Sequence, residues 1–118
     1  MEGKAKEAFE KWYFDTQCEK ERKGGASQRQ LFRWLYDDGQ GVILNSFIIN
    51  WLDSVGIFIE IHTQGLQRWF YYKVKFLEVI ESRELVRNRQ EATEAAIKKA
   101  VEIYNEKYKE NEENNASN

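Results

Sequence analysis

The spacing of apolar residues along this chain changes at Gly56, and this change limits the folds that the chain can adopt. Before Gly56, apolar residues recur every three or four positions, as they do on one side of an α-helix. After Gly56, apolar and polar residues alternate, as they do in a β-strand that buries one face. Separate helical and strand-forming segments predict an α+β fold.

Two helices, the second of them short, are predicted in the first third of the chain. The first covers residues 4–22, where a mostly apolar stripe lies on the side of the helix opposite to its charged residues. Gly24 and Gly25 end this helix. The stripe consists of Ala5, Ala8, Phe9, Trp12 and Thr16. Ser27 and Gln30 have the spacing of a capping box, which opens a second helix that ends in the Asp-Asp-Gly sequence at residues 37–39.

A third helix is predicted for residues 41–55, directly before the change of period. Apolar residues occupy most of its circumference, so we expect it to be the central, buried helix of the fold. Gly56 follows this helix and can adopt the left-handed backbone conformation that ends many helices. The prediction therefore places three helices before the sheet.

Two strands are predicted after Gly56, and a short turn at residues 64–66 joins them into an antiparallel β-hairpin. In the first strand, one side carries Ile57, Ile59 and Ile61, and the other carries Phe58, Glu60 and His62. In the second strand, one side carries Phe70, Tyr72, Val74 and Phe76, and the other carries Trp69, Tyr71, Lys73 and Lys75. Leu85 and Val86 can add a brief third strand.

The last predicted helix covers residues 89–110. Asn88 followed by Glu91 is a capping signal at its start. Its apolar stripe consists of Ile97, Ala100, Val101, Tyr104 and Tyr108. We expect this helix to pack on the sheet and to complete a single globular domain over residues 1–110, and we expect the polar residues 111–118 to form a disordered tail.

The composition is that of a globular protein, with 42% apolar, 32% charged and 14% aromatic residues among 118. A net charge of −2 provides no global positive field that would attract nucleic acid or an anionic membrane. A single cysteine, the lack of a secretory signal and the lack of an apolar segment long enough to cross a bilayer predict a cytoplasmic protein without a membrane anchor.

The side chains do not form a recognisable catalytic or metal-binding pattern. His62 is the only histidine and Cys18 the only cysteine, and they lie in different predicted elements, so neither a nucleophile with its base nor a zinc site is indicated. Asp37, Asp38 and Asp53 are the carboxylates that could bind magnesium, but Asp-Asp-Gly is also ordinary turn chemistry, which we favour. We therefore expect a non-enzymatic protein without a cofactor or a bound metal.

One group of residues in the hairpin is a candidate for binding a protein partner or a nucleic acid. The group consists of Arg68, Trp69, Tyr71, Lys73 and Lys75. Aromatic rings beside cations on a sheet can stack single-stranded bases and neutralise phosphates. The alternative, which we favour, is that the first or the last helix covers Trp69 and Tyr71. The helix at residues 41–55 contains no Lys or Arg, so we reject a winged-helix role for it in the DNA groove.

Three segments spread over most of the chain resemble a known class of proteins. They are Glu-Ala-Phe-Glu-Lys-Trp at residues 7–12, Asp-Ser-Val-Gly-Ile at 53–57, and the run from Gln-Glu-Ala to Tyr-Asn-Glu at 90–106. Taken together, they resemble small uncharacterised accessory proteins encoded by phages and prophages of gut anaerobes. The resemblance implies an accessory protein of a mobile element with no assigned activity, and it carries over no functional residues.

The sequence predicts a protein that acts through protein–protein contacts. Large apolar residues exceed what the helical stripes and one hairpin face require, and surplus apolar surface on a small domain indicates a partner or self-association. Single-stranded nucleic-acid binding by the hairpin is the alternative function. The exposure of Trp69 and Tyr71 is the decisive observation, since buried rings would exclude both binding proposals.

Overall fold

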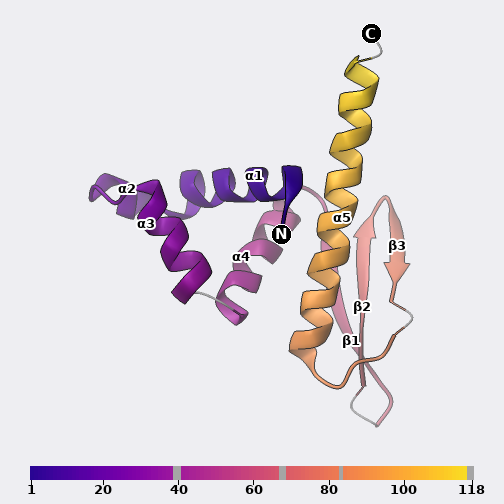
Figure 1. Cartoon of the computed structure of the whole chain (residues 1–118). Helices are drawn as coiled ribbons and strands as arrows, with labels where there is room; N and C mark the ends of the chain where they lie inside the picture. Colours follow the sequence, from indigo (N-terminus) through magenta and orange to yellow (C-terminus); the bar gives the residue numbers. More distant parts are fainter. Residues whose placement is uncertain (39–40, 67–68, 83, 117–118) are drawn as a thin grey trace.

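Helices and a three-stranded antiparallel sheet make up the chain, and the C-terminal helix packs on the sheet (Figure 1). The structure is a computed structural model that describes residues 1–38, 41–66, 69–82 and 84–116, with side chains described up to residue 108. Its elements are α1 (Gly3–Trp12), the π-helical turn η1 (Tyr13–Gln17), α2 (Glu19–Lys23), α3 (Gln28–Arg33), the π-helical turn η2 (Trp34–Asp38), α4 (Val42–Ser54), β1 (Phe58–Gln64), β2 (Trp69–Phe76), β3 (Glu78–Glu81) and α5 (Arg89–Ala116). This arrangement confirms the predicted α+β fold.

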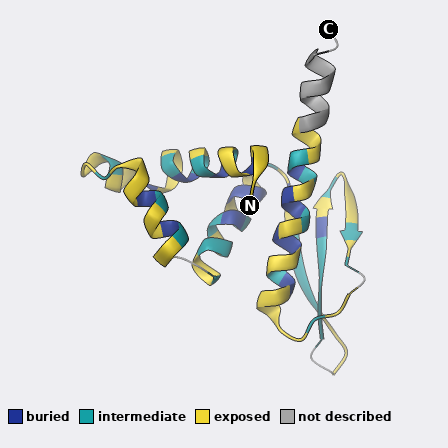
Figure 2. Ribbon diagram, in the orientation of Figure 1, coloured by how far each residue is buried: buried dark blue, intermediate teal, exposed yellow. Residues whose placement is uncertain are grey.

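The core of the protein lies where α1, α4 and α5 meet. Trp51 of α4 is buried, and its ring lies 6.0 Å from the ring of Phe9 in α1 and 4.9 Å from the ring of Tyr104 in α5, edge to face in both contacts. Figure 2 shows the buried residues of α4 and α5 toward the middle of the molecule. The helix predicted to be central is buried along this side only, since Val42 and Ile43 at its start are exposed.

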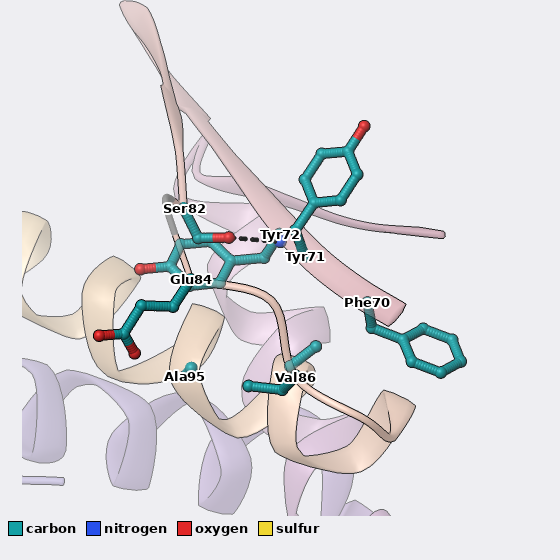
Figure 3. A pocket seen from close by; sticks show the side chains of 8 residues that line it. Phe70, Tyr71, Tyr72, Ser82, Glu84, Val86 and Ala95 are labelled. Carbon is teal, nitrogen blue, oxygen red and sulfur yellow. Dashed lines mark hydrogen bonds between the residues drawn. The ribbon is translucent and has the colours of Figure 1, made fainter. Parts of the chain in front are cut away.

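The strands lie in the order β1-β2-β3, and both pairs are antiparallel. The third strand lies earlier in the chain than predicted, because β3 ends at Glu81 and Val86 makes only an isolated bridge to Phe70. Between Glu81 and Val86 the pairing with β2 is irregular. Here the Tyr72 N–H donates to the side-chain Oγ of Ser82 at 2.9 Å (Figure 3). The sequence Glu-Val-Ile-Glu of β3 does not alternate, so only its pairing with β2 reveals it as a strand.

The first predicted helix is not continuous, because η1 separates α1 from α2. The buried residues Phe9, Tyr13 and Cys18 follow one another at four and then five positions. A π-helical turn holds one residue more than an α-helical turn requires, so it brings Cys18 to the same side as Tyr13. Thr16, which we predicted in the buried stripe, is exposed and donates through Oγ1 to the carbonyl oxygen of Trp12 at 2.6 Å. A constant helical period therefore predicts the wrong residue here.

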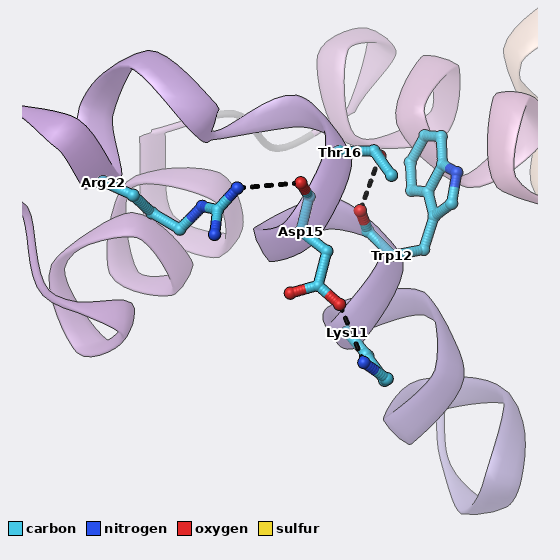
Figure 4. A network of polar contacts seen from close by, with 5 residues as sticks. All are labelled: Lys11, Trp12, Asp15, Thr16 and Arg22. Carbon is cyan, nitrogen blue, oxygen red and sulfur yellow. Dashed lines mark hydrogen bonds and ion pairs between the residues drawn. The ribbon is translucent and has the colours of Figure 1, made fainter.

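Side-chain contacts join η1 to α2 across this break (Figure 4). Arg22 of α2 donates through Nη2 to the carbonyl oxygen of Asp15 at 2.9 Å, and its guanidinium lies 5.2 Å from the centre of the Phe14 ring. Lys11 Nζ lies 2.8 Å from Asp15 Oδ2. This hydrogen bond from Lys11 lowers the pKa of the Asp15 carboxyl.

The predicted caps are present at the start of α3 and at the end of α4. The Gln30 N–H donates to Ser27 Oγ at 3.2 Å, and the Ser27 N–H donates to Gln30 Oε1 at 3.0 Å, which completes the capping box of α3. Gly56 after α4 has φ +83°, and the N–H of Ile57 donates back to the carbonyl oxygen of Leu52 at 2.9 Å. This glycine-dependent turn redirects the chain from α4 into β1, where the period changes.

The long helix α5 begins where the sequence predicts and ends later. Asn88 Oδ1 accepts a hydrogen bond from the Glu91 N–H at 2.8 Å, so the predicted cap is present. The helical backbone continues to Ala116, past the predicted end at residue 110, and the disorder expected for residues 111–118 stays a prediction. Within the described ranges, no helix is both long enough and apolar enough to cross a bilayer.

Candidate functional site

The two faces of the sheet differ in what covers them. One face packs with α5 against the core, and its core-packed residues are Ile59, Ile61, Tyr72, Val74 and Phe76. The opposite face, called the outer face below, carries Phe58, Glu60, His62, Gln64, Trp69, Tyr71, Lys73, Lys75, Val79 and Glu81. Among the described residues, the core includes none of the apolar or aromatic side chains of the outer face.

The interpretation that a helix covers Trp69 and Tyr71 is wrong. Both rings lie on the outer face and are half-buried, and Tyr71 projects away from the residues between β2 and α5 (Figure 3). One feature of the sequence indicates this arrangement. Lys73 and Lys75 share the face of the two rings, and burying two ammonium groups under a helix is far costlier than leaving rings partly exposed.

Residues of the outer face form rows across the strands, because partners in the antiparallel register lie side by side. From one end of the sheet to the other, the rows are Phe58–Lys75–Val79, Glu60–Lys73–Glu81, His62–Tyr71 and Gln64–Trp69. The first row exposes apolar surface on both sides of a lysine, with Phe58 50% exposed and Val79 57% exposed. The second row alternates acid, base and acid.

The charges of the outer face are close to balanced. Lys75 Nζ lies 2.9 Å from Glu60 Oε2, and the hydrogen bond from Lys75 lowers the pKa of Glu60. Lys73 lies between Glu60 and Glu81 in the register. Each of the two lysines therefore has a carboxylate beside it, and the face does not present a row of free cations.

The two large rings of the outer face each have one side occupied. The imidazole of His62 stacks on Tyr71, with 5.2 Å between ring centres and 18° between ring planes. The guanidinium of Arg87 lies 5.3 Å from the centre of the Trp69 ring. These contacts explain why both rings are half-buried without a helix above them.

The structure brings most of the predicted site residues together. Trp69, Tyr71, Lys73 and Lys75 share the outer face, whereas Arg68 lies outside the described residues. The predicted set did not include Arg87, Phe58 or Val79. Phe58 follows from the alternation in β1, but Arg87 and Val79 reach this face only because the chain after β2 folds back along it.

A cavity of about 170 Å³ lies between the sheet and α5 (Figure 3). Ser82 and Glu84 are polar residues of its lining, which is otherwise mostly aromatic or aliphatic. The hydroxyl of Ser82 accepts the backbone N–H of Tyr72 and has no histidine beside it, since His62 lies on the other face of the sheet. Among the described residues of its lining, the cavity therefore does not place a histidine beside the Ser82 hydroxyl.

The remaining candidate groups do not form a reactive site. Within the part of the chain that the structure describes, no three His, Cys, Asp or Glu side chains gather as metal ligands, so Asp37, Asp38 and Asp53 do not form the carboxylate site considered above. Cys18 is a buried free thiol, and burial raises its pKa. A thiol of raised pKa is a poor nucleophile at neutral pH, because the thiolate is the reactive form.

Comparison of the chain with models of protein families, with curated proteins and with solved structures found no match. No residue of this chain therefore receives a role from another protein. The candidate site is defined by the geometry of the outer face.

Proposed function

We propose that this chain is a non-enzymatic interaction protein that binds a protein partner through the outer face of its sheet. One observation carries the proposal: rings and aliphatic side chains occupy this face, and none of those described belongs to the buried core. Apolar surface that a small domain leaves outside its core is typical of a partner site. The polar row Glu60–Lys73–Glu81, which lies between the rows of Phe58 and Tyr71, fits the mixed chemistry of a protein surface.

The charge balance of the outer face favours a protein partner over a single-stranded nucleic acid. Phosphate binding depends on free cations, and the two lysines of this face lie beside carboxylates. The contacts of His62 with Tyr71 and of Arg87 with Trp69 do not by themselves decide between a protein and a nucleic-acid partner. An exposed cation–π contact contributes about 0.5–1 kcal/mol, whereas stacking of a base contributes about 1–3 kcal/mol, so a base could displace Arg87 from Trp69.

We place this binding function in the cytoplasm, because the buried free thiol of Cys18 suits a reducing compartment. An accessory protein of a mobile element, as the sequence resemblance implies, would act by binding a component of its host or of the element. Such a role requires a surface for a partner and does not require a catalytic centre.

Photo-crosslinking in the cells that naturally produce this protein tests the proposal. A benzophenone amino acid replaces Tyr71 on the outer face, and a matched control carries it in place of the exposed Lys98 on α5. We expect a discrete protein adduct from position 71 and a weaker one or none from position 98. Equal labelling from both positions, or none from position 71, contradicts the proposal.

A fluorescence titration tests the nucleic-acid alternative. The proposal predicts that oligonucleotides cause no saturable quenching of tryptophan fluorescence at low salt. Saturable quenching that disappears in Trp69→Phe and weakens steeply with added salt would establish the alternative and overturn the choice of a protein partner.

A further inference from the structure

Within the described part of the chain, the outer edge of β1 has unpaired backbone groups, and their positions follow from the rest of the sheet. On β2, Phe70 exchanges hydrogen bonds with Val86 at 2.7 and 2.9 Å, and the carbonyl oxygen of Tyr72 accepts the Ser82 N–H at 2.9 Å. The even-numbered residues of β2 therefore direct their backbone groups toward β3. Since this direction alternates along a strand, the odd-numbered residues of β2 direct theirs toward β1.

The register then decides which residues of β1 face away from the sheet. The odd-numbered residues of β2 lie opposite Phe58, Glu60, His62 and Gln64. The remaining residues of the strand, Ile59, Ile61 and Thr63, direct their N–H and C=O groups to the free edge. Among the described residues, no backbone hydrogen bond from outside the sheet reaches these groups.

Of the two edges of the sheet, that of β1 is the better suited to accept another strand. β1 has 7 residues, without proline, lysine or a bulge. β3 has 4 residues, and its ladder becomes irregular at Ser82. Short strands and irregular ladders hinder pairing, whereas a longer regular strand with free backbone groups is a template for it.

We propose that β1 pairs antiparallel with β1 of a second copy of this chain, about a two-fold axis at Ile61. In this register all three outward-facing residues form hydrogen bonds, with Ile61 opposite Ile61 and Ile59 opposite Thr63 of the second copy. Glu60 lies opposite His62 of the second copy, so an acid faces an imidazole twice across the axis. The sequence of β1 is therefore complementary to itself.

The two neighbouring registers that also pair outward-facing groups are less favourable. A shift that places Ile59 opposite Ile61 leaves the Thr63 groups unpaired and brings Glu60 against Glu60 of the second copy. The opposite shift leaves the Ile59 groups unpaired and brings His62 against His62. Each shift loses one third of the backbone hydrogen bonds. Each also replaces the two acid–imidazole pairs by a pair of carboxylates or a pair of imidazoles, and two carboxylates directly opposite each other destabilise a sheet.

A second copy is the occupant that this strand specifies. Its β1 supplies an extended strand, aliphatic side chains on the covered face and the matching acid and imidazole on the outer face. Pairing joins the two outer faces into one surface and leaves Trp69 and Tyr71 free. The inference therefore does not depend on the partner proposed for the outer face.

Mass measurements by light scattering and sedimentation test the pairing. We expect the full chain to behave as a dimer of the 14.1 kDa chain that dissociates on dilution. Thr63→Pro removes an outward N–H that β2 does not use, so it should weaken the dimer at least tenfold with an unchanged circular dichroism spectrum. Thr63→Val keeps the N–H and should leave the dimer intact.

Charge variants test the register and stand in for Thr63→Pro if that variant does not fold. His62→Glu places like charges opposite each other and should weaken the dimer, and the double variant Glu60→Lys, His62→Glu should restore it. A strictly monomeric wild-type chain, or a dimer that neither Thr63→Pro nor His62→Glu weakens, overturns the inference. A monomer that still gives an adduct from position 71 overturns this pairing and leaves the proposed function intact.

Discussion

Replacing Gly56 with alanine tests whether the turn between α4 and β1 depends on the left-handed backbone. Gly56 has φ +83°, and a Cβ built there meets no atom within 4 Å, so the cost of alanine comes from the backbone and not from a clash. A left-handed conformation costs an L-residue about 1–2 kcal/mol. The smaller entropy of the unfolded alanine chain offsets about 0.4–1 kcal/mol of this. Gly56→Ala should therefore lower the free energy of unfolding by about 1 kcal/mol.

Gly24 offers a matched control at the end of α2. Its φ is −79°, and an added Cβ would make only ordinary contacts at 3.5 and 3.6 Å. Gly24→Ala should therefore stabilise the protein by about 0.4–1 kcal/mol, through the unfolded chain alone. Urea unfolding followed by tryptophan fluorescence measures both variants. If Gly56→Ala is as stable as Gly24→Ala, the turn does not require glycine and the reasoning is refuted.

Three further predictions concern other parts of the chain. Leu77 has φ +62° and is 99% exposed, so Leu77→Gly should raise the free energy of unfolding by about 1 kcal/mol in urea titrations; an unchanged value would show that the turn carries no strain. The hydrogen bond from Lys75 lowers the pKa of Glu60, so the pair stabilises the fold at neutral pH and loses this effect as the pH falls below about 4. The free energy of unfolding of Glu60→Gln should therefore depend less on pH in that range than that of the wild type. Cys18 is buried and its pKa is raised, so a thiol reagent should label it slowly in the native protein and rapidly in denaturant; rapid native labelling would contradict its burial.

Local features of the chain were predictable because they depend on neighbours in sequence. The capping box of Ser27 and Gln30, the glycine turn after α4 and the alternation of the hairpin involve contacts within a few residues. The break in the first helix was not predictable in this way. It follows from packing Tyr13 and Cys18 into the same core, which a π-helical turn permits and a uniform helical period does not.

The candidate site was predicted in part. Alternation in β2 placed Trp69 and Tyr71 on one face with Lys73 and Lys75, and the structure confirms this grouping. The contacts of the rings with His62 and Arg87 required the strand register and the return of the chain after β3. These contacts join residues far apart in sequence, so no spacing within the chain reports them.

The amino-acid sequence by itself determined which side chains share a face of each strand and where helices give way to strands, because backbone geometry sets the period of each element. The two lysines of β2 already favoured one face for solvent, but the tertiary structure decided that α5 covers the other face, and it alone decided which residues form β3 and which edge stays open. These outcomes depend on competition between surfaces for a single core. The core covers the sheet face without lysines, because ammonium groups remain in water at a lower free-energy cost than apolar and aromatic side chains do.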